Sequence, residues 1–267
     1  MLSWFEPLTI WETSECKNAR SSSVAASCAL ILILILIFSG ASYAAPSHDS
    51  GQDVDSGTFA VLINNKRVAT ETFSIHQNSS GSEITSEFKS EGNGNAADQS
   101  SVLQLEPNGD LKKYSWKEIT PGKAHFTVTP NNDFLMERYS TGPDEKDAEQ
   151  PFLLPNSTAM LDDYSFVQRE VLAWRYFASG CKQDKGQLAC PLHQKTMFGT
   201  INPHARSSAP VSLEFAGREQ VTIHGTEKEL IRLNLKSDAG DWALWLDDQL
   251  KLQRIVVPGE SIEVVRD

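Results

Sequence analysis

Apolar and polar residues alternate with a period of two through most of the first half of the chain. The apolar runs are short and rich in β-branched and aromatic residues, and turn sequences such as Pro107-Asn108-Gly109-Asp110 separate them. The segment 141–150 is acidic, contains Pro and Gly, and is expected to be a surface connection. We predict a meander of antiparallel strands over Gly57–Ile63, Val68–Ile75, Glu83–Ser90, Ser101–Glu106, Leu111–Ile119, Ala124–Thr129 and Phe134–Tyr139.

The period then changes, which predicts one helix over Asp162–Ala178. This stretch has no Gly or Pro, two acids stand at its start, and Ser179-Gly180 follows its end. Apolar residues recur at spacings of three and four, on a face formed by Tyr164, Val167, Val171, Trp174 and Ala178. Further apolar residues flank this face, so we expect the helix to cover a large hydrophobic surface.

Strand patterns return after the helix, and no internal repeat is evident. The predicted strands are Lys195–Ile201, Val211–Phe215, Gln220–Ile223, Glu229–Lys236, Trp242–Asp247, Leu250–Val257 and Ser261–Val265. About a dozen strands with one main helix predict a mainly β fold, in which a curved antiparallel sheet or open barrel carries a covering helix near residues 162–178. The lack of a repeat disfavours a propeller.

An export signal is predicted at the N-terminus. The run Val24–Phe38 is apolar except for Ser27, two basic residues precede it, and Ser42-Tyr43-Ala44 fits a small-x-small cleavage site. We therefore expect a signal peptide over residues 1–44, a flexible leader over 45–56 and a single β-rich domain over 57–267, exported to the periplasm or the exterior without a lipid anchor. A signal anchor extending to Tyr43 remains an alternative.

The net charge of the chain argues against one class of partner. The chain has 267 residues and a formal charge of -11, and without residues 1–44 it has 223 residues and a charge of -10. An acidic chain with no basic stripe lacks the clustered Lys and Arg that bind phosphate backbones, so a nucleic-acid partner is not expected.

Two cysteines, Cys181 and Cys190, remain after the predicted cleavage. In an oxidising compartment an even pair at short separation predicts a disulfide. The alternative is a zinc site that adds His193 and His204, although this spacing matches no usual zinc finger.

No catalytic motif is present. The sequence has neither H-x-x-H nor H-E-x-x-H, no G-x-S-x-G, and no phosphate or dinucleotide loop, so we predict no enzyme activity, no metal and no cofactor. A carboxylate-based glycoside hydrolase is the less favoured alternative, because a sheet can bring two strand acids together. The candidates are Glu71, Glu83, Glu87, Glu214 and Glu219.

The aromatic residues suggest a binding function. A curved sheet covered by the helix can enclose an apolar ligand or lipid. The residues expected to line such a site are Phe59, Val61, Phe73, Phe126, Trp174, Phe177, Trp242 and Leu244. The same residues also suit a filled core in which the helix packs on the sheet.

Two segments carry a resemblance to known proteins. Gly57–Val61 followed by Ala69–Phe73 resembles the opening hairpin of uncharacterised exported bacterial proteins with a large curved antiparallel sheet, and Trp245–Ile255 with Val257-Pro258 resembles their closing hairpin. Ala69 stands where those proteins usually have Gly. Their architecture is similar to the curved sheet and inner helix of periplasmic lipoprotein carriers. The resemblance implies a Gram-negative-type exported protein and an architecture more than an activity. An envelope module acting through protein–protein contacts of its acidic outer face is therefore the alternative to a ligand carrier.

Overall fold

The computed structural model describes residues 51–267 except 92–96, 143, 185–186 and 239. The predicted signal peptide over 1–44 and the first part of the predicted leader lie outside the described residues. Among the described residues, no helix is both long and apolar enough to span a bilayer.

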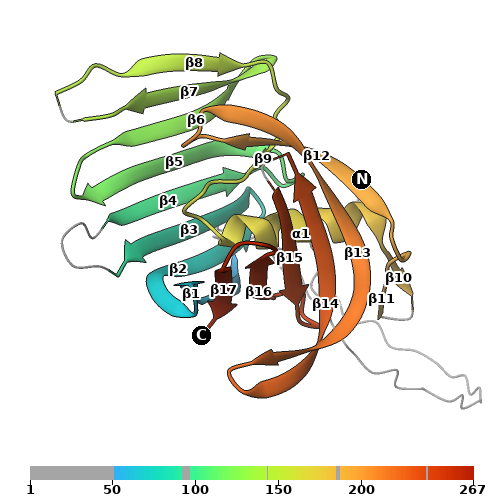
Figure 1. Cartoon of the computed structure of the whole chain (residues 1–267). Coiled ribbons are helices and arrows are strands. Elements are labelled where there is room, and N and C mark those ends of the chain that lie inside the picture. The colour runs from blue at the N-terminus through green and yellow to red at the C-terminus, as the bar shows by residue number, and fades with distance from the viewer. Residues whose placement is uncertain (1–50, 92–96, 143, 185–186, 239) are drawn as a thin grey trace, which may run out of the picture. The chain divides into compact units, whose positions relative to one another are not determined.

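A single curved sheet of fifteen strands dominates the fold (Figure 1). Its order is β8-β7-β6-β5-β4-β3-β2-β1-β17-β16-β15-β14-β13-β12-β9, and neighbours are antiparallel except for β9 beside β12. The strands of the first half are β1 (Gln52–Ile63), β2 (Lys66–Asn78), β3 (Gly81–Ser90), β4 (Asp98–Leu105), β5 (Leu111–Thr120), β6 (His125–Asn131), β7 (Phe134–Ser140), β8 (Ala148–Phe152) and β9 (Ala159–Met160). Those of the second half are β12 (Lys195–Asn202), β13 (Ser207–Ile223), β14 (Thr226–Ser237), β15 (Gly240–Leu246), β16 (Leu252–Val257) and β17 (Ile262–Arg266).

The mainly β prediction is confirmed, but the sheet has more strands than the predicted dozen. β8 extends across the end of the segment predicted as a surface connection, because it pairs with β7. β9 has only two residues and carries no alternating pattern of its own. The edge strands β8 and β9 are not hydrogen-bonded to each other, so the sheet stays open.

Strand β1 begins at Gln52, before the predicted start at Gly57. The partner strand β2 is long enough to pair with the added residues, and Gln52 lies opposite Gln77. The last part of the predicted flexible leader therefore belongs to the sheet.

Strand β13 joins two predicted strands through a bulge. The pairing with β14 shifts between Phe215 and Gly217, and Gly217 has a φ of +116° that glycine tolerates. Because of the extra residue, odd-numbered residues before the bulge and odd-numbered residues after it point to opposite faces of the sheet. Val211 and Leu213 pack in the main core, whereas Val221 and Ile223 pack in a second apolar cluster.

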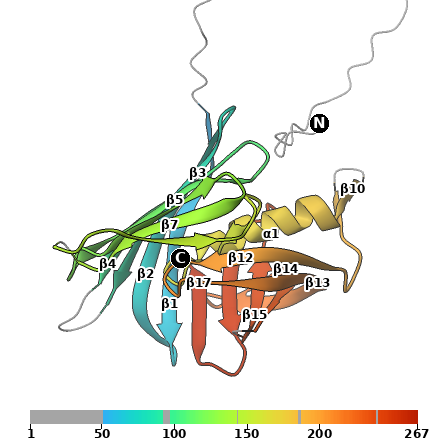
Figure 2. The same cartoon turned by 90° about the horizontal axis from the view of Figure 1, so that it is seen from above.

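Helix α1 (Val167–Gly180) runs along the inside of the curved sheet (Figure 2). We call the sheet face that it covers the inner face. The helix starts later than predicted, because Asp162 forms a turn in which its Oδ1 accepts the N–H of Tyr164 at 2.8 Å. Its buried face also differs from the predicted one: Ala178 is exposed and Val171 is half-buried, while the fully buried residues include Leu172, Ala173, Tyr176 and Phe177.

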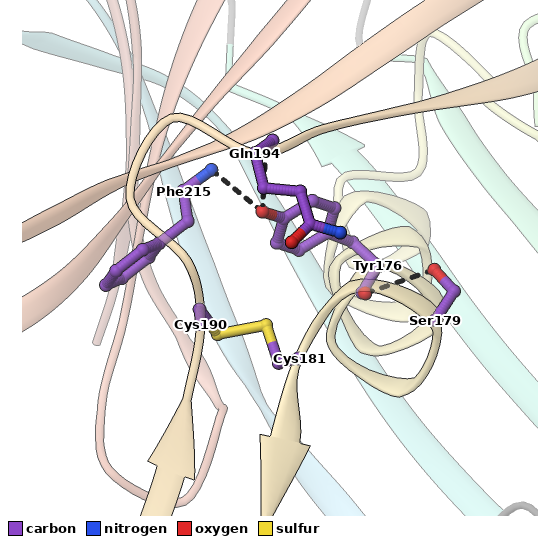
Figure 3. The surroundings of a disulfide bond; sticks show 6 residues. All are labelled: Tyr176, Ser179, Cys181, Cys190, Gln194 and Phe215. Carbon is purple, nitrogen blue, oxygen red and sulfur yellow. Dashed lines mark hydrogen bonds between the residues drawn. A yellow bond between two sulfur atoms is a disulfide. The ribbon is translucent and has the colours of Figure 1, made fainter.

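A disulfide closes the hairpin that follows the helix (Figure 3). Cys181 and Cys190 are bonded with an S–S distance of 2.08 Å, as the sequence predicts, and enclose β10 (Lys182–Asp184) and β11 (Gln187–Ala189). Nearby, the Tyr176 hydroxyl donates to the carbonyl of Gln194 at 2.9 Å and accepts the N–H of Phe215 at 3.0 Å. The end of the helix is thus attached to β13 and to the segment before β12.

Candidate functional site

The eight residues predicted to line a ligand site all belong to one apolar cluster on the inner face. Six of them are buried, and Trp174 and Trp242 are partly buried and pack against the others. The buried members are Phe59, Val61, Phe73, Phe126, Phe177 and Leu244. The fold therefore brings the predicted residues together, from four strands and the helix.

Aromatic contacts organise this cluster. Phe59 on β1 stacks on Phe73 of β2, with ring centroids 4.8 Å apart. Trp242 faces the Arg169 guanidinium at 4.7 Å from its ring centre. The indole N–H of Trp174 donates to the carbonyl of Leu250 at 2.7 Å. These contacts hold α1 against the sheet through aromatic residues at several points along its length.

An enclosed cavity lies beneath α1 where the helix meets β4 and β5. Its volume is about 10 Å³, and its lining includes Leu103, Leu111, Met160 and Leu172. This volume suits about one water molecule. In this conformation the helix fills the inner face at this place, so a lipid-sized molecule needs the helix to move.

Glu71 of β2 holds the start of the helix. Its carboxylate is fully buried and accepts the N–H of Phe166 at 2.8 Å, the Ser86 hydroxyl at 2.6 Å and the Ser165 hydroxyl at 3.3 Å. Phe166 at the N-cap makes no side-chain cap of its own. Glu71 therefore supplies the hydrogen-bond acceptor that a helix N-terminus needs. Burial raises the pKa of Glu71 to about 7, and these hydrogen bonds and the charge of Arg169 oppose the rise.

A second polar cluster surrounds Asp55 one turn further along the helix. Asp55 forms a bidentate pair with Arg266 at 2.8 and 2.9 Å, and Lys251 Nζ lies 3.0 Å from its Oδ1. Glu170 of α1 accepts the N–H of Leu252 at 2.8 Å and lies 3.7 Å from Arg266.

The pKa values of Asp55 and Glu170 are shifted in opposite directions. Burial, together with the charge of Asp55, raises the pKa of Glu170 well above its usual range. Burial also acts to raise the pKa of Asp55, but hydrogen bonds from Glu170, Lys251 and Arg266 outweigh it and lower the pKa. The neighbouring charges therefore favour the ionised form of Asp55 beside Arg266 and Lys251 and the protonated form of Glu170.

A third polar cluster lies before the helix, around Asp162. Both Asp162 and Tyr114 are fully buried, and the Tyr114 hydroxyl donates to Asp162 Oδ2 at 2.6 Å. His204, in the turn between β12 and β13, places Nδ1 at 3.0 Å from Asp162 Oδ1. This approach is within ion-pair distance but is not aligned as a hydrogen bond.

The five strand acids proposed for a hydrolase have separate surroundings. Glu71 caps the helix, Glu83 is exposed and accepts from Gln104, and Glu87 is exposed beside Lys89. On the other half of the sheet, Glu214 pairs with His193 and Lys195, and Glu219 pairs with Arg232 and with the indole N–H of Trp245.

The zinc alternative is incompatible with the observed bonding. Both cysteine sulfurs are used in the disulfide, and His193 lies beside Glu214 while His204 lies beside Asp162. In the part of the chain that the structure describes, no group of three or more His, Cys, Asp or Glu side chains is arranged to hold a metal ion.

Comparison with family models, curated proteins and solved structures finds no significant match to this chain. Its function is therefore argued from the arrangement of its own residues.

The aromatic pattern did not point to the buried ionisable residues of the inner face, although a sequence signal for them exists. Glu71 stands between Ala69 and Phe73, and Glu137 stands between Leu135 and Tyr139, at positions where the alternation expects an apolar residue. In the helix, Arg169 and Glu170 interrupt an apolar stretch. A charged residue in an inward position of an otherwise apolar pattern is the signal that could have identified this site.

Proposed function

We propose that the protein is an exported, non-enzymatic carrier of an apolar ligand or lipid, and that helix α1 occupies the ligand-binding face when no ligand is bound. The ligand would lie on the inner face, against Phe59, Phe73, Trp242 and their neighbours. The curved sheet with an inner helix and the resemblance to exported bacterial proteins support this proposal.

The observation that carries the proposal is the chemistry of the interface between helix and sheet. Besides apolar contacts, it buries Glu71, Arg169 and Glu170, each of which loses hydration on burial. Replacing buried ionic groups with apolar residues of similar volume is often neutral or stabilising, so a helix that only filled a core would gain little from them. Polar groups on both surfaces would instead be hydrated when the helix moves away, which lowers the free energy of opening.

The sizes involved require α1 to move if an alkyl ligand is to bind beneath it. The cavity of about 10 Å³ beneath α1 is too small for any alkyl chain. Apolar binding sites for small molecules usually measure about 300 to 1,000 Å³. Displacement of α1 would uncover the apolar residues of the inner face, Phe59, Phe73 and Leu244 among them, and leave the strand pairing in place.

A fluorescence titration with 1-N-phenylnaphthylamine tests the proposal. Apparent affinity equals the intrinsic affinity multiplied by the fraction of molecules in the open state. Glu71→Ala removes the helix cap and raises that fraction, so we expect tighter probe binding, by about tenfold for each 1.4 kcal/mol of destabilised closed state. Glu83→Ala, an exposed acid on the neighbouring strand β3, is the matched control and should bind the probe as the wild type does.

Two results would reject the carrier proposal. One is the absence of saturable 1:1 probe binding in wild-type and Glu71→Ala proteins that retain their β spectrum. The other is a purified native complex that carries a stoichiometric protein partner and no apolar molecule in mass spectra, which would favour the envelope-module alternative.

A further inference from the structure

Glu137 on β7 is a buried carboxylate without hydrogen-bond partners. Its side chain has no exposed surface, and neither Oε1 nor Oε2 accepts a hydrogen bond from any residue that the structure describes. The other buried acids of the inner face differ: Glu71, Asp162, Glu170 and Asp55 each accept at least one hydrogen bond. Since buried polar groups are almost always satisfied, Glu137 indicates a missing donor.

The strand register places Glu137 beside the His204 turn. Glu137 lies opposite Val128 on β6, and Val128 lies opposite Tyr114 on β5. In the adjacent row, Tyr139, Phe126 and Trp116 follow one another across the same three strands. Glu137 is therefore on the face where Tyr114 binds Asp162, next to a row of aromatic rings.

His204 sits among aromatic rings and also lacks a hydrogen bond. Its ring centroid lies 4.5 Å from Trp116, 4.7 Å from Tyr164 and 5.0 Å from Phe126, with the rings nearly perpendicular. Within the described residues, neither imidazole nitrogen is hydrogen-bonded, and the positive charges of His204 and Arg206 act on Glu137. Glu137 thus lacks a hydrogen-bond partner, while His204, which lies 3.0 Å from Asp162 Oδ1, sits among aromatic rings near it.

Side chains connect the two halves of the open sheet at this place. The turn between β12 and β13 reaches β7 and β8, since the Arg206 guanidinium lies 4.7 Å above the Tyr139 ring and its carbonyl accepts from Gln150 at 3.4 Å. Asn202 donates to Asp163 at 2.7 Å. In the described structure, contacts of the turn between β12 and β13, and not strand pairing, join these parts of the sheet, so a ligand that reaches Glu137 would have to displace side chains of this turn rather than a sheet hydrogen bond.

A buried carboxylate that lacks donors and lies beside a row of aromatic residues is suited to an organic cation. A primary ammonium offers three N–H donors, and aromatic faces attract positive charge. Neutral or anionic head groups would provide fewer donors or repel the carboxylate. The geometry points to Glu137, with His204 and its aromatic neighbours, as the head-group subsite for a long-chain primary amine. This inference rests on the proposed function, because the alkyl tail would lie on the inner face.

The protonation behaviour of Glu137 agrees with this assignment. Burial raises the pKa of Glu137 to about 7, the charges of Arg206 and His204 oppose the rise, and Asp162 adds to it. A bound ammonium would favour the ionised carboxylate, which the empty site disfavours.

Competition against the bound fluorescent probe tests the subsite with three alkyl ligands kept below their micelle concentrations. These are dodecylamine, dodecanol and dodecanoic acid, at pH 7.5. We expect the wild type to bind dodecylamine at least tenfold more tightly than dodecanol and dodecanoic acid most weakly. Glu137→Gln should lose the preference for the amine while its affinity for dodecanol stays within twofold. Glu149→Gln, an exposed acid on β8 with the same change of net charge, should keep the preference.

The outcomes separate this inference from the carrier proposal. If no alkyl ligand displaces the probe and the probe itself does not bind, both proposals fail. If dodecanol binds but the amine has no advantage, or if Glu137→Gln keeps the advantage, only the head-group assignment is overturned. The wild-type comparison of amine and alcohol needs no variant, and His204→Gln, which should reduce the preference, provides a second test should Glu137→Gln not fold.

Discussion

The Glu71 carboxylate accepts the backbone N–H of Phe166 at 2.8 Å, across 95 residues of sequence. Glu71 lies in the middle of β2 and Phe166 is the N-cap of α1. The helix lacks a side-chain cap from its own N-cap residue, so the sheet provides one. The position of the N-terminus of α1 is therefore linked to the protonation state of the buried Glu71.

The stability of the protein should fall as the pH rises through 7, partly because of Glu71. Its pKa is about 7 in the folded protein and 4.5 as an ordinary glutamate, so the folded state binds the proton more tightly. The resulting stabilisation is complete below about pH 4.5 and is lost as the pH rises through 7, by roughly 3 kcal/mol. Urea unfolding from pH 5 to 8 measures this loss.

The variant Glu71→Gln should remove the part of this pH dependence that Glu71 contributes, because glutamine does not titrate. Glu83→Gln, on the exposed side of β3, should retain the wild-type slope. Glu137 contributes in the same direction, so Glu71→Gln should keep part of the slope. Equal slopes in Glu71→Gln and wild type would contradict the assignment of a raised pKa to this residue.

Arg266→Met should destabilise the protein strongly. Arg266 forms the bidentate pair with Asp55, and its loss leaves a buried carboxylate with Lys251 as its remaining cation. Breaking one side of a buried pair costs about 3 to 5 kcal/mol. Arg218→Met, which removes surface contacts to Glu229 and Asp248, should cost less than about 1 kcal/mol in the same urea titration. Similar losses for the two variants would rule out a structural role for the buried pair.

Tyr114→Phe should weaken the turn before α1. The variant removes the hydroxyl that donates to Asp162 at 2.6 Å, and a hydrogen bond to a charged group contributes about 1.5 to 3 kcal/mol. Tyr164→Phe is the control, since Tyr164 is more than one third exposed. Thermal unfolding of both variants would show the difference, and an unchanged Tm for Tyr114→Phe would indicate that water replaces the hydroxyl.

Removal of the disulfide should destabilise the end of the helix. The double variant Cys181→Ala, Cys190→Ala loses a link between residues nine positions apart, which the loop-entropy model values at about 2 to 3 kcal/mol. Amide exchange should rise first at Cys181, whose N–H donates to the Phe177 carbonyl at 3.1 Å, and in β10 and β11. Uniform exchange increases across the whole sheet would argue against a local role.

Local patterning was sufficient to predict most of the strands, the existence of the helix and the disulfide. Alternating residues in Leu111–Thr120 or Phe134–Ser140 specify a strand by themselves, because side chains of a strand point to opposite faces in turn. The period of Val167, Val171 and Trp174 that predicted the helix is equally local, although the face that the helix buries is centred on Leu172 and Tyr176. Two cysteines at short separation suffice to predict their bond. The eight predicted site residues were brought together because large apolar side chains are driven into one core.

Only the tertiary structure determined which partners the buried polar and charged residues contact. Glu71 and Phe166, Asp55 and Arg266, and Tyr114 and Asp162 lie 95, 211 and 48 residues apart, and no local pattern encodes such pairs. The bulge near Gly217, the short strand β9 and the later helix start at Val167 likewise depend on partners elsewhere in the sheet. The sequence alone therefore determined the elements and the apolar face, since these follow from the period of neighbouring residues. The polar attachments of the helix and the unpartnered Glu137 arise only when distant strands meet.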